Sequence, residues 1–443
     1  MFDFVGLWMF PALILLIVVG VPVAYSMLGV AFVFGLMRFG EAAAVSLFMT
    51  KTVETASNYV LGAIPLFIFM GAILEKSGVA GRLFDALYLW TRRLPGSLAI
   101  STMIMCTLFG GPMGIAGGVE TLVGLLALPP MLRRGYDKGL ISGTICAGGS
   151  LGTAIPPSIT IVVLAPIADV SVGDLFAGTM VPGMLQAGMF LLYILIVCWI
   201  WPSLAPSALA EEEEANQPKF WEKVRITSMA LLPTVVLIVT VIGTVLWGLA
   251  TPTESAACGC VGSLALAAMY RGLNFKVFVE ALYTTLSITA LIMLIVLAGS
   301  IFSTIFYASG GMTGVQTLLD NFGITNWQAI VFIMVLAFLA GFVLDLISVT
   351  FILVPVAMPL LAASGVDPIW FCVLFLFILQ TSYLSPPMAP SIFYLRAIAP
   401  PEIRLVDMYR GVVPFIALQV VTILLILAFP GMATWLPEVL YVK

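Results

Sequence analysis

Two apolar stretches of this sequence are interrupted by paired prolines, and the residues beside those prolines could bind a cation. Residues 139–169 contain Pro156-Pro157, and residues 369–399 contain Pro386-Pro387. Each stretch has about the length of a membrane-spanning helix, and a proline inside a helix costs roughly 3 kcal/mol or more. The break frees carbonyl groups of the preceding turn, near Gly152. These are hard oxygen ligands, which suit Na+ by extension from other hard cations.

The same break exposes the N-terminus of the following half-helix, which suits an anion. After Pro156-Pro157 this positive end lies at Ser158 and Ile159, and backbone N–H groups there attract a carboxylate. Non-helical backbone in a membrane survives only where protein or a wet cavity surrounds it. Each break therefore predicts a polar site for an ion and an anionic cargo, enclosed by other helices.

Each break is expected to face the tip of a short hairpin. The first hairpin is 97–132, and its tip, "FGGPMGIAGGVE", is rich in glycines that let backbone carbonyls approach an ion closely. The second hairpin is 328–363, and its tip carries Asp345 followed by hydroxyl side chains. An acid in an apolar hairpin is expensive and usually functional, so Asp345 is the strongest single candidate. Packing glycines and structural kinks are the alternative interpretation.

Two other acids are interpreted differently. Glu120 lies at the end of the first tip, where it could act in the core, lie on a wet face or pair with a basic residue. In "ATPTESAA", Thr251 is a good N-cap, Pro252 suits the first helical position and Glu254 completes a capping box. We interpret this second motif as scaffold architecture.

Composition sets the class of protein. Of the 443 residues, 62% are hydrophobic and only 9% are charged, which predicts a polytopic membrane protein. The N-terminus has no basic region typical of a cleavable signal peptide, and no basic patch with interleaved aromatics suggests nucleic acid. There is no histidine, and the six cysteines lie in apolar segments. A transition-metal site, a disulfide or an intramembrane enzyme is therefore not expected.

The two halves of the chain resemble each other. A shift of 230 residues places Gly111 on Gly341, Pro129 on Pro359, Asp137 on Asp367 and Pro156-Pro157 on Pro386-Pro387. The matched residues are helix breakers and caps, which disfavours chance similarity between apolar runs.

These halves predict two inverted repeats in an all-α polytopic membrane protein. The first repeat is 1–202, a cytoplasmic polar linker is 203–227, and the second repeat is 228–443. Basic residues flank the first hairpin but not the second, which predicts that they enter from opposite sides. Five crossings plus one re-entrant hairpin in each half would invert the second repeat. Inverted repeats with broken helices are typical of a secondary transporter.

Several motifs resemble one known family. They are "GVPVAYSMLG", "IPLFIFMGAILEKSGVAGRL", "GTAIPPSITIVVLAPIADVSVGDLFAGTMVPG", "GLATPTESAACG", "LDLISVTFILVPVAMPL" and "SPPMAPSIFYLRAIAP". With them, nearly the whole chain resembles the large membrane subunit (DctM type) of tripartite ATP-independent periplasmic (TRAP) transporters.

The resemblance implies an elevator-type transporter in the bacterial inner membrane. It implies Na+-coupled import of a small organic acid, with a small four-helix membrane subunit (DctQ type) and a periplasmic substrate-binding protein (DctP type) as partners. Na+ would be the coupling ion, and no other cofactor is expected. A stand-alone Na+/dicarboxylate-type symporter without a binding protein is the alternative.

Carried over residue by residue, the resemblance and the breaks predict two sets of residues. The predicted cation ligands are Gly110, Gly111, Gly114, Gly152, Thr153, Ile155, Gly341, Asp345, Thr381, Ser382 and Ser385. The predicted substrate-binding residues are Gly117, Glu120, Ser158, Ser348, Thr350 and Met388. Many family members have a serine-containing first tip, whereas this chain has "GGPMGIAGG", so the first ion would rely more on carbonyls. No Lys or Arg falls in the predicted core, which leaves helix N-termini and hydroxyls to hold the cargo carboxylate.

Overall fold

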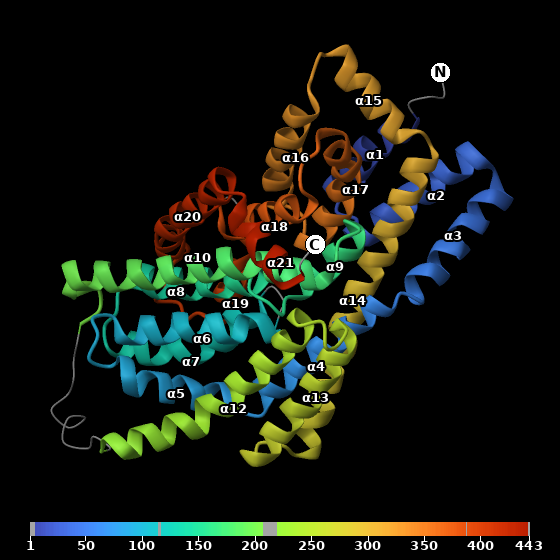
Figure 1. The fold of residues 1–443 in the computed structure, drawn as a ribbon. Helices are drawn as coiled ribbons and strands as arrows, with labels where there is room; N and C mark the ends of the chain where they lie inside the picture. The colour runs from blue at the N-terminus through green and yellow to red at the C-terminus, as the bar shows by residue number, and fades with distance from the viewer. Residues whose placement is uncertain (1–4, 114–116, 207–218, 387, 442–443) are drawn as a thin grey trace.

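The computed structural model describes residues 5–113, 117–206, 219–386 and 388–441, and every regular element in those ranges is a helix. The all-α prediction is therefore confirmed (Figure 1). The first half contains η1 (Val5–Trp8), α1 (Met9–Val18), α2 (Val23–Phe39), α3 (Glu41–Ala56), η2 (Tyr59–Gly62), α4 (Ala63–Lys76), α5 (Val79–Thr91), α6 (Ser97–Met113), α7 (Gly118–Arg133), α8 (Lys138–Ser150), η3 (Leu151–Thr153), α9 (Ile159–Ile167), α10 (Val172–Ile200) and η4 (Pro202–Leu204). The second half contains α12 (Phe220–Leu246), α13 (Pro252–Met269), α14 (Phe275–Ala308), α15 (Gly311–Asn321), α16 (Asn326–Ala340), α17 (Leu346–Ser364), α18 (Pro368–Leu384), α19 (Pro390–Ile398), α20 (Leu405–Ala428) and α21 (Gly431–Tyr441).

Many of these helices are long and apolar enough to cross a bilayer. Within the described ranges, six helical segments meet that standard: η2 with α4, α10, α12, α14, α17 and α20. The outer surface of the bundle carries large apolar side chains; Trp199 is 74% exposed and Trp221 is 79% exposed. Such exposure is unfavourable in water but suits lipid. The chain is a multi-pass membrane protein.

The helices form two groups (Figure 1). In one group, α14 packs against α2, α3 and α4, and α4 packs against α13. In the other group, α8 packs against α6, α7, α18 and α20. The proline-bearing gaps between η3 and α9 and between α18 and α19 both belong to the second group. The predicted site therefore lies in the second group, and the first group packs beside it through α4 and α14.

The contacts of the second group occur in matching pairs. The 230-residue shift relates α6 to α16, α7 to α17, α8 to α18, α9 to α19 and α10 to α20. Helix α6 packs against α7 as α16 packs against α17, α7 packs against α19 as α17 packs against α9, and α8 packs against α20 as α18 packs against α10. The two halves thus share both an order of helices and a way of packing, as the predicted repeats require.

A buried polar contact marks the centre of this arrangement. The hydroxyl of Ser150 accepts hydrogen bonds from Gln380 Nε2 at 3.2 Å and from Gln419 Nε2 at 3.1 Å. Ser150 and Gln380 are related by the 230-residue shift. Two equivalent positions can touch only near the axis that relates the halves, so this contact locates an approximate two-fold axis between α8 and α18.

Matching helix ends follow from matching residues. Asp137 caps α8 by accepting from Leu140 N–H, and Asp367 caps α18 by accepting from Ile369 and Trp370 N–H. Gly135 and Gly365 lie just before them with φ of 70° and 65°, a conformation that favours glycine. The residues that made the repeat visible in the sequence are therefore those that start and end the helices.

The predicted capping box at α13 is confirmed. Thr251 Oγ1 accepts from Glu254 N–H at 3.3 Å, and Glu254 accepts from Thr251 N–H at 2.8 Å. The structure also contains helices outside the predicted hairpins and broken stretches, among them α3, α5, α15 and α21. Helix α12 also begins at Phe220 rather than near 228, since its first turns are helical but polar. The acidic part of the predicted linker lies outside the described residues.

Candidate functional site

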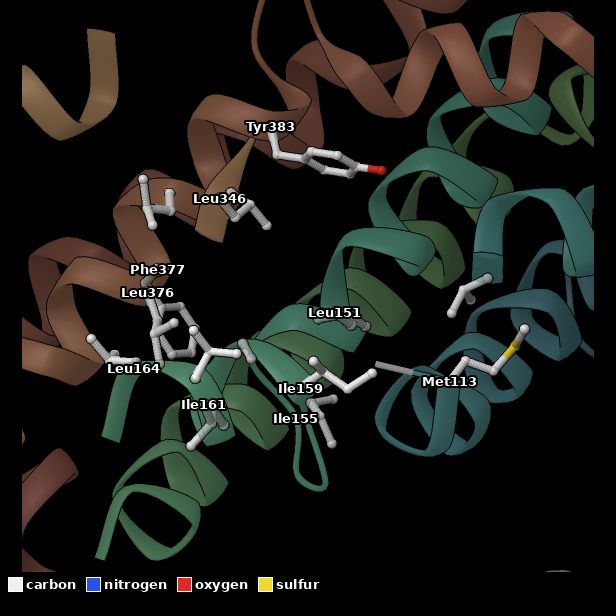
Figure 2. Packing of buried hydrophobic residues seen from close by; sticks show 14 of the residues in the cluster. Met113, Leu151, Ile155, Ile159, Ile161, Leu164, Leu346, Leu376, Phe377 and Tyr383 are labelled. Carbon is white, nitrogen blue, oxygen red and sulfur yellow. The ribbon is translucent and has the colours of Figure 1, made fainter. Parts of the chain in front are cut away.

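The first break is fully enclosed by protein. Helix α8 ends at Ser150, η3 ends at Thr153, and α9 begins at Ile159. Every residue from 151 to 160 is buried. Figure 2 shows Leu151, Ile155 and Ile159 lying together at this interruption. The enclosure is what non-helical backbone in a membrane requires.

Hydroxyl groups in this break bond to nearby carbonyls. Ser158 has extended backbone at the N-cap of α9, and its Oγ donates to the Thr153 carbonyl at 2.9 Å. Thr153 Oγ1 in turn donates to the Ser150 carbonyl at 2.8 Å. Ile155 offers only its backbone, since its side chain is apolar and 6% exposed. The polar atoms predicted at this break are therefore within one short, buried segment.

The first hairpin meets the first break through glycine backbone. A Cβ added at Gly152 would lie 2.7 Å from the Gly110 carbonyl oxygen, and one added at Gly111 would lie 2.5 Å from the Pro156 carbonyl oxygen. Only glycine allows such a close approach of two backbones. The structure thus brings Gly110, Gly111 and Gly152 together. Gly114 lies outside the described residues.

The second break makes an equivalent contact with its hairpin, but Ser382 takes the place of Gly152. A Cβ added at Gly341 would lie 2.0 Å from Ser382 Oγ. Ser382 Oγ donates to the Leu379 carbonyl and Ser385 Oγ donates to the Thr381 carbonyl, both at 2.7 Å. Gly341 therefore lies directly against the predicted hydroxyl ligands of α18.

Asp345 is placed differently from a buried ion ligand. It is exposed and is the N-cap of α17. Its carboxylate accepts from Ser348 N–H at 3.0 Å and from the Ser348 hydroxyl. Thr350 is 1% exposed, and its Oγ1 donates to the Leu346 carbonyl. The tip therefore presents one carboxylate at an accessible helix N-terminus.

The second break is more open than the first. Met388 is 45% exposed and Pro386 is also exposed, whereas the first break is buried throughout. Met388 and Asp345 are thus the accessible members of the predicted set.

Gly117 and Glu120 lie at the start of α7, next to α19. Gly117 has φ of 88°, and a Cβ there would lie 2.5 Å from the Tyr394 ring. Glu120 is 0% exposed and contacts α8, since a Cβ at Gly149 would lie 2.2 Å from Glu120 Cδ. Gly117 and Glu120 therefore lie where the first hairpin packs against both broken helices, at α8 and at α19.

The sequence interpretation missed the Ser150, Gln380 and Gln419 cluster. Gln380 and Gln419 are 0% and 1% exposed, and each leaves its Oε1 without a hydrogen-bond partner among the described residues. The 230-residue shift could have found Ser150 and Gln380, because it pairs two polar residues inside apolar helices.

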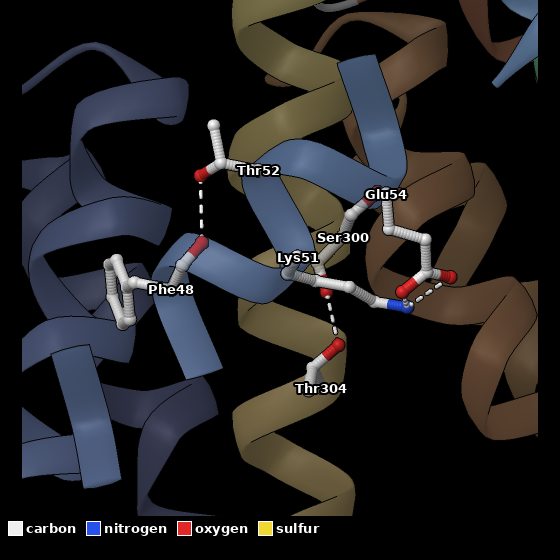
Figure 3. Close-up of polar contacts among 6 residues, drawn as sticks. All are labelled: Phe48, Lys51, Thr52, Glu54, Ser300 and Thr304. Carbon is white, nitrogen blue, oxygen red and sulfur yellow. Dashed lines mark hydrogen bonds and ion pairs between the residues drawn. The ribbon is translucent and has the colours of Figure 1, made fainter. Parts of the chain in front are cut away.

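It also missed a cavity of about 300 Å³ between the two groups of helices. Lys51 and Glu54 of α3 line one side, and Ser300 and Thr304 of α14 line another (Figure 3). The remaining walls come from α9 and α17. Lys51 Nζ lies 2.8 Å from both Glu54 carboxylate oxygens. A basic side chain, paired with Glu54, therefore lines a cavity beside the broken-helix group, although none was predicted in the core.

Comparison with known proteins agrees with this architecture. A sequence model of the family "Tripartite ATP-independent periplasmic transporter, DctM component" matches residues 10–432. The chain is 28% identical to the C4-dicarboxylate TRAP transporter large permease protein DctM of Pseudomonas aeruginosa, over 88% of each chain. It is 27% identical to the ectoine/5-hydroxyectoine TRAP transporter large permease protein UehC of Ruegeria pomeroyi, over 98% of this chain and 99% of that one.

A solved structure shares the fold. The Alcanivorax borkumensis YdaH transporter matches with a TM-score of 0.65 at 15% identity, covering 92% of this chain and 96% of that one. At this identity the likeness concerns the fold alone.

Proposed function

Because the chain belongs to the DctM component family of tripartite ATP-independent periplasmic transporters, we propose that it imports a small organic acid by Na+-coupled, elevator-type alternating access. It is a large permease subunit and not an enzyme. The proposed location is the bacterial inner membrane. The proposed partners are a small four-helix membrane subunit (DctQ type) and a periplasmic substrate-binding protein (DctP type).

The observation that carries the proposal is the paired contact between hairpins and breaks. Gly110 meets Gly152 in the first half, and Gly341 meets Ser382 in the second. Each contact sets backbone carbonyls and hydroxyls beside a helix terminus, the combination that suits a hard cation together with a carboxylate. We assign one Na+ to each contact.

The cargo is proposed to be a small carboxylate held near the helix N-terminus at Ser158. Relatives named for C4-dicarboxylates and for ectoine make succinate and malate the first probes and ectoine the second. A stand-alone symporter is the less favoured alternative, because family members are permeases of tripartite systems.

Reconstituted transport tests the coupling. Proteoliposomes containing this chain and both partners are expected to accumulate radiolabelled succinate, malate or ectoine only when an inward Na+ gradient is imposed. Omission of the binding protein should remove uptake. Uptake that ignores Na+ and follows an imposed pH step, or full uptake by this chain alone, would overturn the corresponding part of the proposal.

Lys51 is proposed to attract the cargo carboxylate into the cavity. Removal of its charge in Lys51→Met is expected to raise the KM for uptake by about tenfold to a hundredfold, since a hydrogen bond to a charged group contributes about 1.5–3 kcal/mol. Initial rates over a range of cargo concentrations measure the effect.

A matched control is Lys276→Met. Lys276 pairs with Glu280 at 3.9 Å on α14, its side chain is 85% exposed, and it does not line the cavity. Its loss should leave KM within about twofold, because exposed ion pairs contribute little. Equal KM values in the two variants would remove Lys51 from the cargo path.

A further inference from the structure

One buried carboxyl has no charged partner among the described residues. Glu120 lies in the first turn of α7 and is 0% exposed. Its Oε2 accepts the Gly117 backbone N–H at 3.1 Å. Its Oε1 has no hydrogen-bond partner among the described residues. The start of α7 therefore supplies a hydrogen bond to one carboxyl oxygen of Glu120, and the other oxygen has none.

The groups that face Glu120 come from every helix packed around it, and all are neutral at pH 7. They are Cys106 of α6, Cys146 of α8, Tyr383 of α18 and Tyr394 of α19. In the described part of the chain, the ion pairs formed by lysine and arginine do not include Glu120. Asp345 adds a distant negative charge that acts on Tyr394. The surroundings thus offer no positive side chain to balance a carboxylate.

Tyr383 is the polar group directed at this carboxyl. Figure 2 shows its hydroxyl pointing away from α18 toward the helices of the first half. The hydroxyl interacts with Glu120 but lacks the geometry of a completed hydrogen bond, and it has no other partner among the described residues. Two buried oxygens therefore face each other without a completed hydrogen bond between them.

A proton neutralises this buried carboxyl better than a metal ion does. An ionised carboxylate without a cation costs several kcal/mol to bury, and such a group normally becomes neutral. Hard metal cations take about six oxygen ligands or more. The unpaired oxygens that interact with each other here are Glu120 Oε1 and the Tyr383 hydroxyl, and no cluster of acids or cysteines that could hold a metal occurs in the described ranges.

We propose that Glu120 is a proton-binding site of the transport cycle, separate from the two Na+ contacts. The carboxyl carries its proton while α7, α8, α18 and α19 enclose it beside the Tyr383 hydroxyl. The proton moves onto Oε1 from water and returns to water, so no other reactant is needed. Exchange with water rests on the proposed function, because it requires α7 to separate from α19 during alternating access.

The test that needs no cargo is infrared spectroscopy of the purified full chain in lipid at pH 7. The wild type is expected to show the carbonyl stretch of a protonated carboxylic acid. Glu120→Gln should lose that band, and Glu280→Gln, which alters an exposed acid of α14, should keep it. A wild-type spectrum without the band, or a band that persists in Glu120→Gln, would overturn the proposal.

Two further measurements guard against ambiguous outcomes. Should Glu120→Gln fail to fold, Glu120→Asp keeps an acid at the site and is expected to shift the band rather than abolish it; an unshifted band would count against Glu120. Titration with Na+ should leave the band in place. Its disappearance on adding Na+ would mean that Glu120 holds Na+ instead of a proton.

Transport adds a second readout. At a fixed Na+ gradient, wild-type uptake should fall as pH rises, approaching about tenfold per pH unit once most of the carboxyl has lost its proton. Glu120→Gln stays neutral, so the uptake it retains should not depend on pH. Equal pH profiles would overturn the proton proposal. Absence of Na+-driven uptake would instead refute the proposed function, and the infrared result would still decide the proton site.

Discussion

Gly152→Ala is expected to abolish most Na+-driven uptake while the protein still inserts and folds. The added Cβ would lie 2.7 Å from the Gly110 carbonyl oxygen, which is far inside ordinary contact distance. Either the hairpin or the break must move, at a cost of about 1–3 kcal/mol. Since that carbonyl is a proposed Na+ ligand, the displacement should lower Na+ affinity by a factor of about 5 to 150. Uptake at limiting Na+ measures the loss.

Gly188→Ala is the matched control for that substitution. Gly188 lies in α10, and a Cβ added there meets nothing within 4 Å. It should transport like the wild type and gain slight helix stability, because alanine is the better helix former by about 1 kcal/mol. If Gly152→Ala kept wild-type Na+ dependence, the contact between Gly110 and Gly152 would be a packing contact only.

The breaks could be predicted because proline and glycine act through the backbone. Pro156-Pro157 cannot continue α8, and this property of the residue type requires no knowledge of neighbours. Glycine permits the Gly110–Gly152 approach but does not specify which backbone it meets. The 230-residue shift worked for the same reason, since Asp137 and Asp367 each cap a helix locally. Local chemistry therefore predicted where the chain is interrupted.

Residues whose role depends on distant neighbours were harder to predict. Lys51 belongs to α3, which carries neither a proline break nor a glycine-rich tip, and it lines a cavity only because α14, α9 and α17 pack beside it. Gln419 comes from a helix that carries no break, yet it donates to Ser150, 269 positions away. Glu120 was predicted as a substrate-binding residue, and the lack of a basic partner among the described residues becomes visible only when four other helices surround it.

The structure also relates the two proposed ion contacts to each other. The first break is buried throughout, whereas Asp345 and Met388 are exposed at the second. An elevator cycle requires that sites be enclosed at one stage and reached by water at another. The exposed carboxylate of Asp345 is the group through which Na+ would first reach the second contact. The negative charge of Asp345 should therefore affect Na+ binding more than its hydrogen bonds with Ser348 do.

Asp345→Asn separates these two properties. Asparagine caps a helix as well as aspartate does, so the bond from Ser348 N–H is kept while the charge is lost. We expect the Na+ concentration for half-maximal uptake to rise at least about tenfold, or about 1.4 kcal/mol, with thermal stability within about 0.5 kcal/mol of the wild type. Asp345→Ala, which also removes the cap, should in addition lose about 1 kcal/mol of stability.

Asp367→Asn is the control that makes this outcome specific. Asp367 is also an N-cap aspartate, and it accepts from Ile369 and Trp370 N–H at the start of α18. The break follows the opposite end of α18, after Leu384. Its substitution should leave Na+ dependence unchanged. An equal rise in both variants would indicate a general effect of surface charge, and no rise in Asp345→Asn would exclude Asp345 as a ligand. A rise confined to Asp345→Asn would assign the charge at the second tip to Na+ binding.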